Sequence, residues 1–379
     1  MSQVVALATF LLLASPAFAW NALGHKVVCK IAWDSIDSET QDEIVAAIRR
    51  HPRYDQDFAK DLPATDNAEL IFLHAGTWPD IARGIRGPDR EKFDHPIWHY
   101  VNFPVTIGEY PAPKTNTSTD PADNKSVAWN VSQATKVSLA AIHGDAPPQQ
   151  KAVAYCWLFH LVGDMHQPLH SVALFSERFP RGDRGGNSIR LVRGDNLHSL
   201  WDNLLGRSHK LNDVKRAVAE LRSRSELWEI DTTGSVDDWI AESRELAESF
   251  VYCPEVIEAV EQPGEFQPVL LSDDYLREAG DHARARIVAA GLRLGALLGG
   301  DRVAVEGPEV DESVFAGTPP ESESRNPVPE SAVAPVNTGY WLNLNSNVRH
   351  NSSCRNYEGT KNGRHCTADE GKPCGICGG

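Results

Sequence analysis

After residue 19 the chain lacks any apolar run of the roughly 20 residues that a membrane helix needs, so we expect no membrane span. Positive charge is also scarce: 37 Lys and Arg against 52 Asp and Glu give a net charge of -15. This balance argues against a general nucleic-acid binder with a basic surface. Cysteine is sparse before residue 339, where only Cys29, Cys156 and Cys253 occur, so at most one disulfide is expected among these three.

Residues 1–19 do form an apolar run, and it ends in the small-x-small sequence Ala17-Phe18-Ala19. This pattern is typical of a secretory signal peptide cleaved after Ala19, although no Lys or Arg precedes the apolar run. We therefore expect a secreted or periplasmic protein. Cleavage leaves Trp20 as the first residue, and its free amine and carbonyl oxygen can chelate a metal ion.

Two His-x3-Asp pairs stand out, His160 with Asp164 and His198 with Asp202. A spacing of four places both side chains on one face of a helix. The apolar stretch 152–161 predicts a buried helix that Pro168 ends, and His170 follows this break. Imidazole nitrogen and carboxylate oxygen together suit zinc. A single pair of this kind is more commonly a surface or capping interaction.

Other histidines lie in apolar or aromatic surroundings. His25 falls on an expected first helix, 21–33, and His99 lies in the aromatic segment 98–103. An aromatic cluster around a histidine is either core packing with a hydrogen-bonded imidazole or a metal ligand beside a stacking surface for a flat substrate. Residues 188–193 alternate in polarity and predict a small hairpin.

Taken together, these positions resemble the secreted zinc-dependent, single-strand-specific nucleases of moulds and plants, the S1/P1 type. The family pattern is filled in order by nine residues: Trp20, His25, Asp80, His99, His160, Asp164, His170, His198 and Asp202. The segments Gln167-Pro168-Leu169 and Gly185-Gly186-Asn187 and a terminal helix over 290–298 are also similar. The resemblance covers residues 20–298 and implies a mainly α-helical domain of the phospholipase C and single-strand nuclease type, with a trinuclear zinc cleft.

The resemblance also implies residue roles. Asp80, His99, His160 and Asp164 are expected to hold one zinc ion. Trp20, His25 and the bridging Asp164 are expected to hold a second, and His170, His198 and Asp202 a third. Asp80, Arg83 and Asp164 are the expected catalytic residues, with Arg83 on the scissile phosphate. Tyr100, Asn102 and Asn187 are expected to contact substrate.

The implied reaction is hydrolysis of single-stranded DNA and RNA to 5′-phosphate products by metal-activated water. Three divalent ions carry about six positive charges, which offset the acidic balance locally. Asn102 stands where the mould enzymes have an Asp that contacts the base, so base preference stays open, as does a 3′-nucleotidase activity. Single strands or nucleotides are the expected substrates, and no obligate protein partner is evident.

Two alternatives remain. Zinc-dependent phospholipase C enzymes share the architecture, but the spacing of five between Trp20 and His25 and the final Asp202 favour the nuclease. A non-catalytic, exported zinc-binding protein is the second alternative. Storage sites tend to be closed by four protein ligands, whereas catalytic sites keep a position for water.

The C-terminal part differs in composition. Residues 299–338 are acidic and rich in Pro and Ser, as in a solvated linker. Residues 339–379 form a Cys-rich module that is too short to bury a large core. His350, Cys354, Cys374 and Cys377 are a plausible tetrahedral zinc set. An exported setting equally allows two disulfides among its four cysteines.

Overall fold

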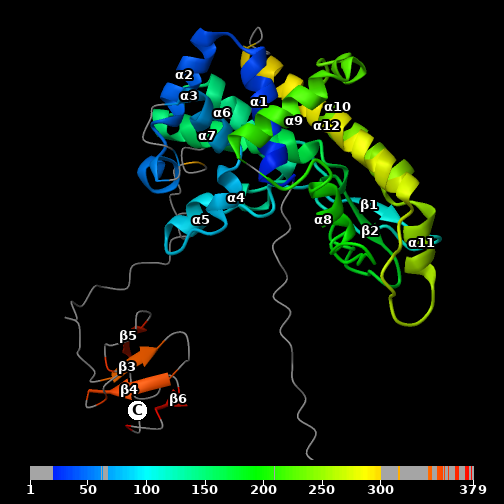
Figure 1. Cartoon of the computed structure of the whole chain (residues 1–379). Coiled ribbons are helices and arrows are strands. Elements are labelled where there is room, and N and C mark those ends of the chain that lie inside the picture. Colours follow the sequence, from blue (N-terminus) through cyan, green and yellow to red (C-terminus); the bar gives the residue numbers. More distant parts are fainter. Residues whose placement is uncertain are drawn as a thin grey trace, which may run out of the picture. The chain divides into compact units, whose positions relative to one another are not determined.

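The computed structural model describes residues 20–60, 62, 67–208, 210–299 and 315, and in the C-terminal part 340–343, 348–352, 354, 357, 363–366, 372–374 and 377. The expected signal peptide, 1–19, and nearly all of the expected linker, 299–338, lie outside these residues. The chain divides into two compact units, Met1–Pro320 and Glu321–Gly379 (Figure 1). None of the described helices combines the length and apolarity needed to cross a membrane.

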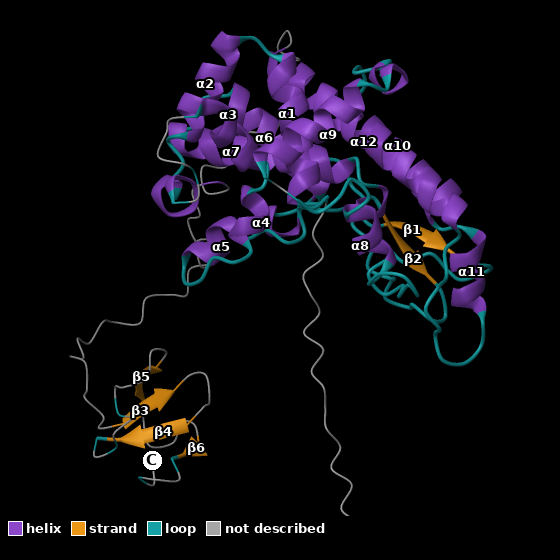
Figure 2. Cartoon of the chain, in the orientation of Figure 1, coloured by secondary structure: helices purple, strands orange, loops and turns teal. Residues whose placement is uncertain are grey.

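The first unit is mainly helical, which confirms the fold class implied by the resemblance (Figure 2). Its α-helices are α1 (Ala22–Ser35), α2 (Ser38–Ile48), α3 (Ala68–Ala75), α4 (Trp78–Ala82), α5 (Asp89–Phe93), α6 (Val131–His143), α7 (Pro148–Met165), α8 (Leu197–Asp202), α9 (Leu211–Arg222), α10 (Val236–Leu246), α11 (Pro254–Glu261) and α12 (Asp273–Gly299). Short 3-10 and π turns are η1 (Asp55–Ala59), η2 (Pro121–Asp123), η3 (Ser126–Ala128), η4 (Pro168–His170), η5 (Ser225–Trp228) and η6 (Ala247–Val251).

Helix α7 lies inside this unit. Nearly every residue from Ala152 to Met165 is buried, as expected of a helix that is apolar on all sides. Proline at its first turn favours its start, since the proline nitrogen has no proton to leave unpaired there. The helix ends at Met165, and Pro168 opens the turn η4 that carries His170. One buried helix and one turn thus bring three of the expected ligands into the protein interior.

The long helix α12, drawn in yellow in Figure 1, packs closely on α1. Glycine makes this approach possible: a Cβ added at Gly291 would lie 2.5 Å from the Cβ of Ile31. The next glycine on the same face, Gly295, similarly lies against Ser35. Helix α1, which carries His25, is therefore fixed against the longest helix of the unit.

Two short strands form a small sheet beside the helices. Strands β1 (Phe103–Thr106) and β2 (Val172–Phe175) run parallel, with Phe103 opposite Val172. The Val101 N–H also donates to the His170 carbonyl oxygen at 2.8 Å. Because His99 and His170 each lie a few residues before one of these strands, the pairing brings the two histidines together. The small hairpin expected around 188–193 is reduced to one antiparallel bridge between Arg190 and Asn196, flanked by the Leu197 N–H to Ile189 O bond of 2.9 Å. Leu191 also makes a parallel bridge to Val269.

The second unit contains a four-stranded sheet in the order β5-β3-β4-β6. Its strands are β3 (Tyr340–Asn343), β4 (Val348–Asn351), β5 (Gly363–Cys366) and β6 (Lys372–Pro373). Strand β3 pairs antiparallel with β4 and β5, and β6 pairs parallel with β4.

Candidate metal centre

Eight of the nine expected ligands gather through their side chains in three adjoining groups. The groups are His25, His160 and Asp164; Asp80, His99 and His160; and His170, His198 and Asp202, and within each group the ligand atoms lie within 4.8 Å of one another. Helices α1, α4, α7 and α8 supply six of these side chains, and the segments before β1 and β2 supply His99 and His170. His160 belongs to two groups, so these two groups adjoin.

Asp164 lies between the first two groups. Its Oδ1 lies 3.4 Å from His25 Nε2, and its Oδ2 lies 3.0 Å from His99 Nδ1 and 3.3 Å from His160 Nε2. One carboxylate oxygen therefore faces each group. This is the arrangement that a carboxylate bridging two metal ions requires.

Backbone carbonyl groups fix the tautomers of three histidines. His160 Nδ1 donates to Gly76 O at 2.9 Å, His170 Nδ1 to His99 O at 2.6 Å, and His198 Nδ1 to Gly185 O at 2.6 Å. A carbonyl accepts only from a protonated nitrogen, so in each neutral ring Nε2 carries the lone pair. Ligand histidines are commonly oriented by such bonds from the other ring nitrogen.

The Nε2 lone pairs of His170 and His198 face each other at 3.2 Å. His160 Nε2 lies 3.0 Å from His99 Nδ1, which is also 3.0 Å from Asp164 Oδ2. Two lone pairs at this distance repel unless a proton or a cation lies between them. In tetrahedral zinc coordination, bonds of about 2.0 to 2.1 Å separate adjacent ligand atoms by about 3.3 Å. The observed spacings therefore fit a zinc ion.

Burial sets the charge states of these groups. All three carboxylates and all five imidazoles are buried or nearly so. Burial and the charge of Arg83 lower the pKa of His25 to about 3, so its imidazole is neutral, as metal binding requires. Burial raises the pKa of Asp80 to about 7 and the pKa values of Asp164 and Asp202 well above the ordinary value. Buried carboxylates of this kind are compensated when they coordinate a cation.

Several polar atoms of these side chains make no hydrogen bond. Both ring nitrogens of His25, Nε2 of His99, and one oxygen each of Asp80 and Asp164 are buried in this way. Native proteins seldom leave buried polar atoms unsatisfied, and metal coordination is one way to satisfy them. The donor types and the missing hydrogen bonds both fit the zinc ions that the resemblance implies.

Trp20, the ninth expected ligand, is buried beside these groups. Its side chain packs closely on Gly24: a Cβ added at Gly24 would lie 2.7 Å from Trp20 Cβ. The following residue, Asn21, donates its backbone N–H to Asp202 O at 3.2 Å and accepts from His25 N at the same distance. The start of the described chain is thus hydrogen-bonded to residues of two metal groups.

Sequence reasoning missed Gln167 as a residue that orients a ligand. Its Nε2 donates to Asp202 Oδ1 at 2.8 Å, and its Oε1 accepts from the Leu169 N–H at 2.6 Å. The other carboxylate oxygen of Asp202 faces His198 Nε2 at 3.6 Å. The sequence analysis noted Gln167 only within the family-like segment Gln167-Pro168-Leu169 and gave its side chain no role.

A cavity of about 590 Å³ opens onto two of the three groups, those that contain His99 and His170. His99, His170 and His198 line it, together with Arg83 and all three residues expected to contact substrate, Tyr100, Asn102 and Asn187. Three arginines that the sequence analysis did not single out, Arg90, Arg181 and Arg184, line it as well. Arg83 Nε lies 3.4 Å from Asp80 Oδ1. The cavity therefore combines metal ligands, an aromatic ring and four guanidinium groups.

The fold and the site together define a mainly helical protein whose buried His and Asp side chains suit a cluster of divalent ions. A profile of the S1/P1 Nuclease family matches residues 20–300. Endonuclease 4 of Arabidopsis thaliana is 26% identical over 306 residues, which is 76% of this chain and 90% of that protein. Nuclease S1 of Aspergillus oryzae is 24% identical over 199 residues, 52% of this chain and 57% of that protein.

The chain belongs to the S1/P1 nuclease family. This confirms the family resemblance inferred from the nine positions. Family membership supports a nuclease function, with nucleic acid as the substrate.

Proposed function

We propose that the chain is an exported, zinc-dependent endonuclease that hydrolyses single-stranded DNA and RNA to 5′-phosphate products. The observation that carries this proposal is the set of three buried His/Asp groups, two of which contribute ligands to the wall of a cavity lined by four arginines. Family membership supports the nuclease chemistry. Removal of residues 1–19 is part of the proposal, because it frees the amine of Trp20.

The ligands are assigned as the resemblance implies. Asp80, His99, His160 and Asp164 hold one zinc ion; Trp20, His25 and Asp164 hold a second; His170, His198 and Asp202 hold a third. When bound, zinc ions lower the pKa of a water molecule towards neutrality and neutralise charge on a phosphate.

The protein residues orient these ions and the substrate. Asp164 presents one oxygen to each of two groups, so it fixes their separation. Arg83 lies on the cavity wall beside Asp80, where its guanidinium donates to the scissile phosphate and stabilises the charge that develops there. His170, His198 and Asp202 are three protein ligands, which leaves coordination positions for water or substrate. That open set argues against a storage site.

The residues that line the cavity support the proposed preference for single strands. Tyr100 is half-buried in its wall and offers a ring on which an unpaired base stacks. Asn102 and Asn187 offer amide groups to a base or sugar. A base inside a duplex cannot reach such a ring without leaving its stack, which costs a few kcal/mol.

The test uses protein that begins at Trp20. We expect cleavage of single-stranded DNA and RNA to 5′-phosphates, slower cleavage of duplex, loss with chelator and recovery with zinc. Asp164→Asn should lower kcat/KM by at least about 100-fold, because the effect of a ligand should at least match that of its second-shell partners. Asp195→Asn, at an exposed position, is the matched control.

Other outcomes favour the alternatives. Phosphatidylcholine cleavage without nucleic-acid cleavage would assign the chain to phospholipase C chemistry. Tight zinc binding without hydrolysis of either substrate would favour a sequestering role. Including a 3′-mononucleotide among the substrates decides whether the chain is also a 3′-nucleotidase.

A further inference from the structure

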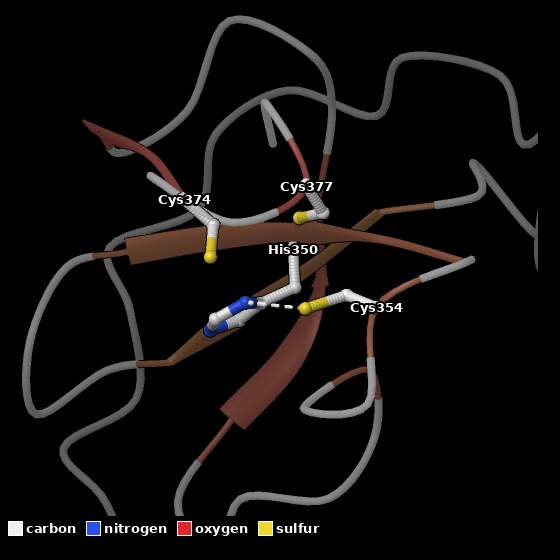
Figure 3. Close-up of side chains that lie close together, drawn as sticks. All are labelled: His350, Cys354, Cys374 and Cys377. Atoms are coloured by element: carbon white, nitrogen blue, oxygen red, sulfur yellow. Dashed lines mark hydrogen bonds between the residues drawn. The ribbon is translucent and has the colours of Figure 1, made fainter.

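We propose that the second unit holds one structural zinc ion through His350, Cys354, Cys374 and Cys377. The four ligand atoms lie within 4.8 Å of one another, and the side chains converge on one point (Figure 3). This site is separate from the proposed nuclease centre, whose side-chain donors are all His and Asp.

The distance between the donor atoms of His350 and Cys354 fits zinc coordination. His350 Nδ1 and Cys354 Sγ are 3.4 Å apart. Tetrahedral zinc, with bonds of about 2.1 Å to nitrogen and 2.3 Å to sulfur, separates such a pair by about 3.6 Å. Three sulfur donors and one imidazole form one of the usual structural zinc sets.

The sheet builds this cluster from two segments. His350 lies on β4, and Cys354 follows in a turn closed by the Cys354 N–H to Asn351 O bond of 3.0 Å. Cys374 directly follows β6, and its N–H donates to Arg349 O at 3.0 Å. Asn351 Nδ2 donates to Cys377 O at 2.7 Å. Backbone pairing therefore holds the Cys-x2-Cys segment against β4.

The described part of this unit buries little apolar side-chain surface. Among its described residues, the buried ones are Leu342, His350, Cys354, Cys366 and Cys374, so Leu342 is the single buried aliphatic side chain within the described part. Three of these five belong to the cluster. Small units with so little apolar burial usually need a metal or disulfides. A zinc ion bound at this cluster would supply that stabilisation, because its binding free energy adds to folding.

The arrangement favours zinc over the disulfides that the sequence left open. All seven cysteines are thiols in the structure. Two disulfides would need all four cysteines of the unit, yet Cys366 lies on β5, on the far side of β3 from β4. The cluster instead contains three cysteines and a histidine. A histidine contributes to a metal site but not to a disulfide. Four protein donors also close the coordination sphere, as in structural sites.

Cobalt replacement in the full chain tests this proposal. Thiolate-to-cobalt charge transfer absorbs in the near ultraviolet, and the proposed nuclease centre has no sulfur donor to contribute. We expect this band in the wild-type chain, its loss in Cys374→Ser and His350→Ala, and its retention in Cys366→Ser, a buried cysteine of the same unit outside the cluster. Zinc content should fall by one ion per chain in the first two variants only.

A second measurement needs no variant. In the native wild-type chain, a strong chelator should raise the number of thiols that react with a thiol reagent by at least three, because the three cluster thiols are released and loss of zinc also exposes the buried Cys366 where the unit opens. Equal charge-transfer bands in wild type and Cys374→Ser, or no chelator-dependent thiols, would overturn the proposal. Cleavage of single-stranded DNA, measured in parallel, should be unchanged in all three variants, so failure of the nuclease proposal would be seen separately.

Discussion

Gln167 illustrates how one buried side chain serves two purposes. It holds Asp202 Oδ1 and accepts from the Leu169 N–H. Gln167→Met keeps the size of the side chain and removes both hydrogen bonds. We expect zinc to bind the third group about 10- to 100-fold more weakly, the usual effect of losing a group that orients a ligand. The measurement is the zinc concentration that half-restores activity after chelation.

The control for this prediction separates orientation from stability. Losing the partner of the buried Leu169 N–H should also lower the free energy of unfolding by about 1 to 3 kcal/mol. A purely structural role would lower stability and leave the zinc concentration for half-activity unchanged, which would contradict the prediction. Gln262→Met, at an exposed helix end, should change neither quantity.

At this scale the sequence indicated the ligand side chains but not what orients them. Spacing in the sequence pointed to His160, His170 and His198, and the structure brings these side chains together. Their tautomers depend on the carbonyls of Gly76, His99 and Gly185. Every residue has a carbonyl, so no residue type marks these partners, and only the fold selects them. Arg181 and Arg184 were missed because no spacing or motif distinguishes them from the other arginines, and only the fold places them at the cavity.

At the scale of elements, helix α12 offers a matched pair of glycines. A Cβ at Gly291 would lie 2.5 Å from Ile31 Cβ and 3.1 Å from Val28 O, whereas at Gly280 it would meet only the flexible side chain of Arg284. Gly291→Ala should therefore destabilise the first unit by about 1 to 3 kcal/mol. Gly280→Ala should stabilise it by up to about 1 kcal/mol, because alanine is the better helix former. Urea unfolding with zinc present measures both, and equal shifts would contradict the prediction.

The same helix shows what periodicity could and could not predict. The apolar segment 290–298 predicted a terminal helix, yet α12 begins at Asp273. Its first half is rich in Arg, Asp and Glu, and its side chains reach other elements: Tyr275 donates to Val251 O, and Arg286 pairs with Glu242 of α10. The alternation in 188–193 predicted a hairpin, and the structure reduces it to the antiparallel Arg190–Asn196 bridge, while Leu191 also bridges to Val269. A strand pattern shows that a segment is extended without identifying its partner.

At the scale of the whole molecule, the negative net charge repels a nucleic acid, whereas the arginines at the cavity attract it. The chain carries a net charge of -15, yet Arg83, Arg90, Arg181 and Arg184 all line the cavity. Binding of a single strand should therefore depend on these few contacts. Each phosphate neutralised on a single strand contributes about -0.7 to the slope of log K against log salt. Four arginines allow a slope no steeper than about -3.

Removing two of these arginines should then flatten the salt dependence by about 1.4. The variant combines Arg181→Gln with Arg184→Asn, because Arg184 has a φ of 62° and asparagine tolerates that region better than most residues. Binding of a hydrolysis-resistant oligothymidylate at several salt concentrations, followed by fluorescence anisotropy, gives the slope. Arg193→Gln is the control, since Arg193 is exposed, pairs with Asp273 and lies outside the cavity lining. If both proteins keep the wild-type slope, the bound strand does not contact Arg181 and Arg184, and another surface must neutralise its phosphates.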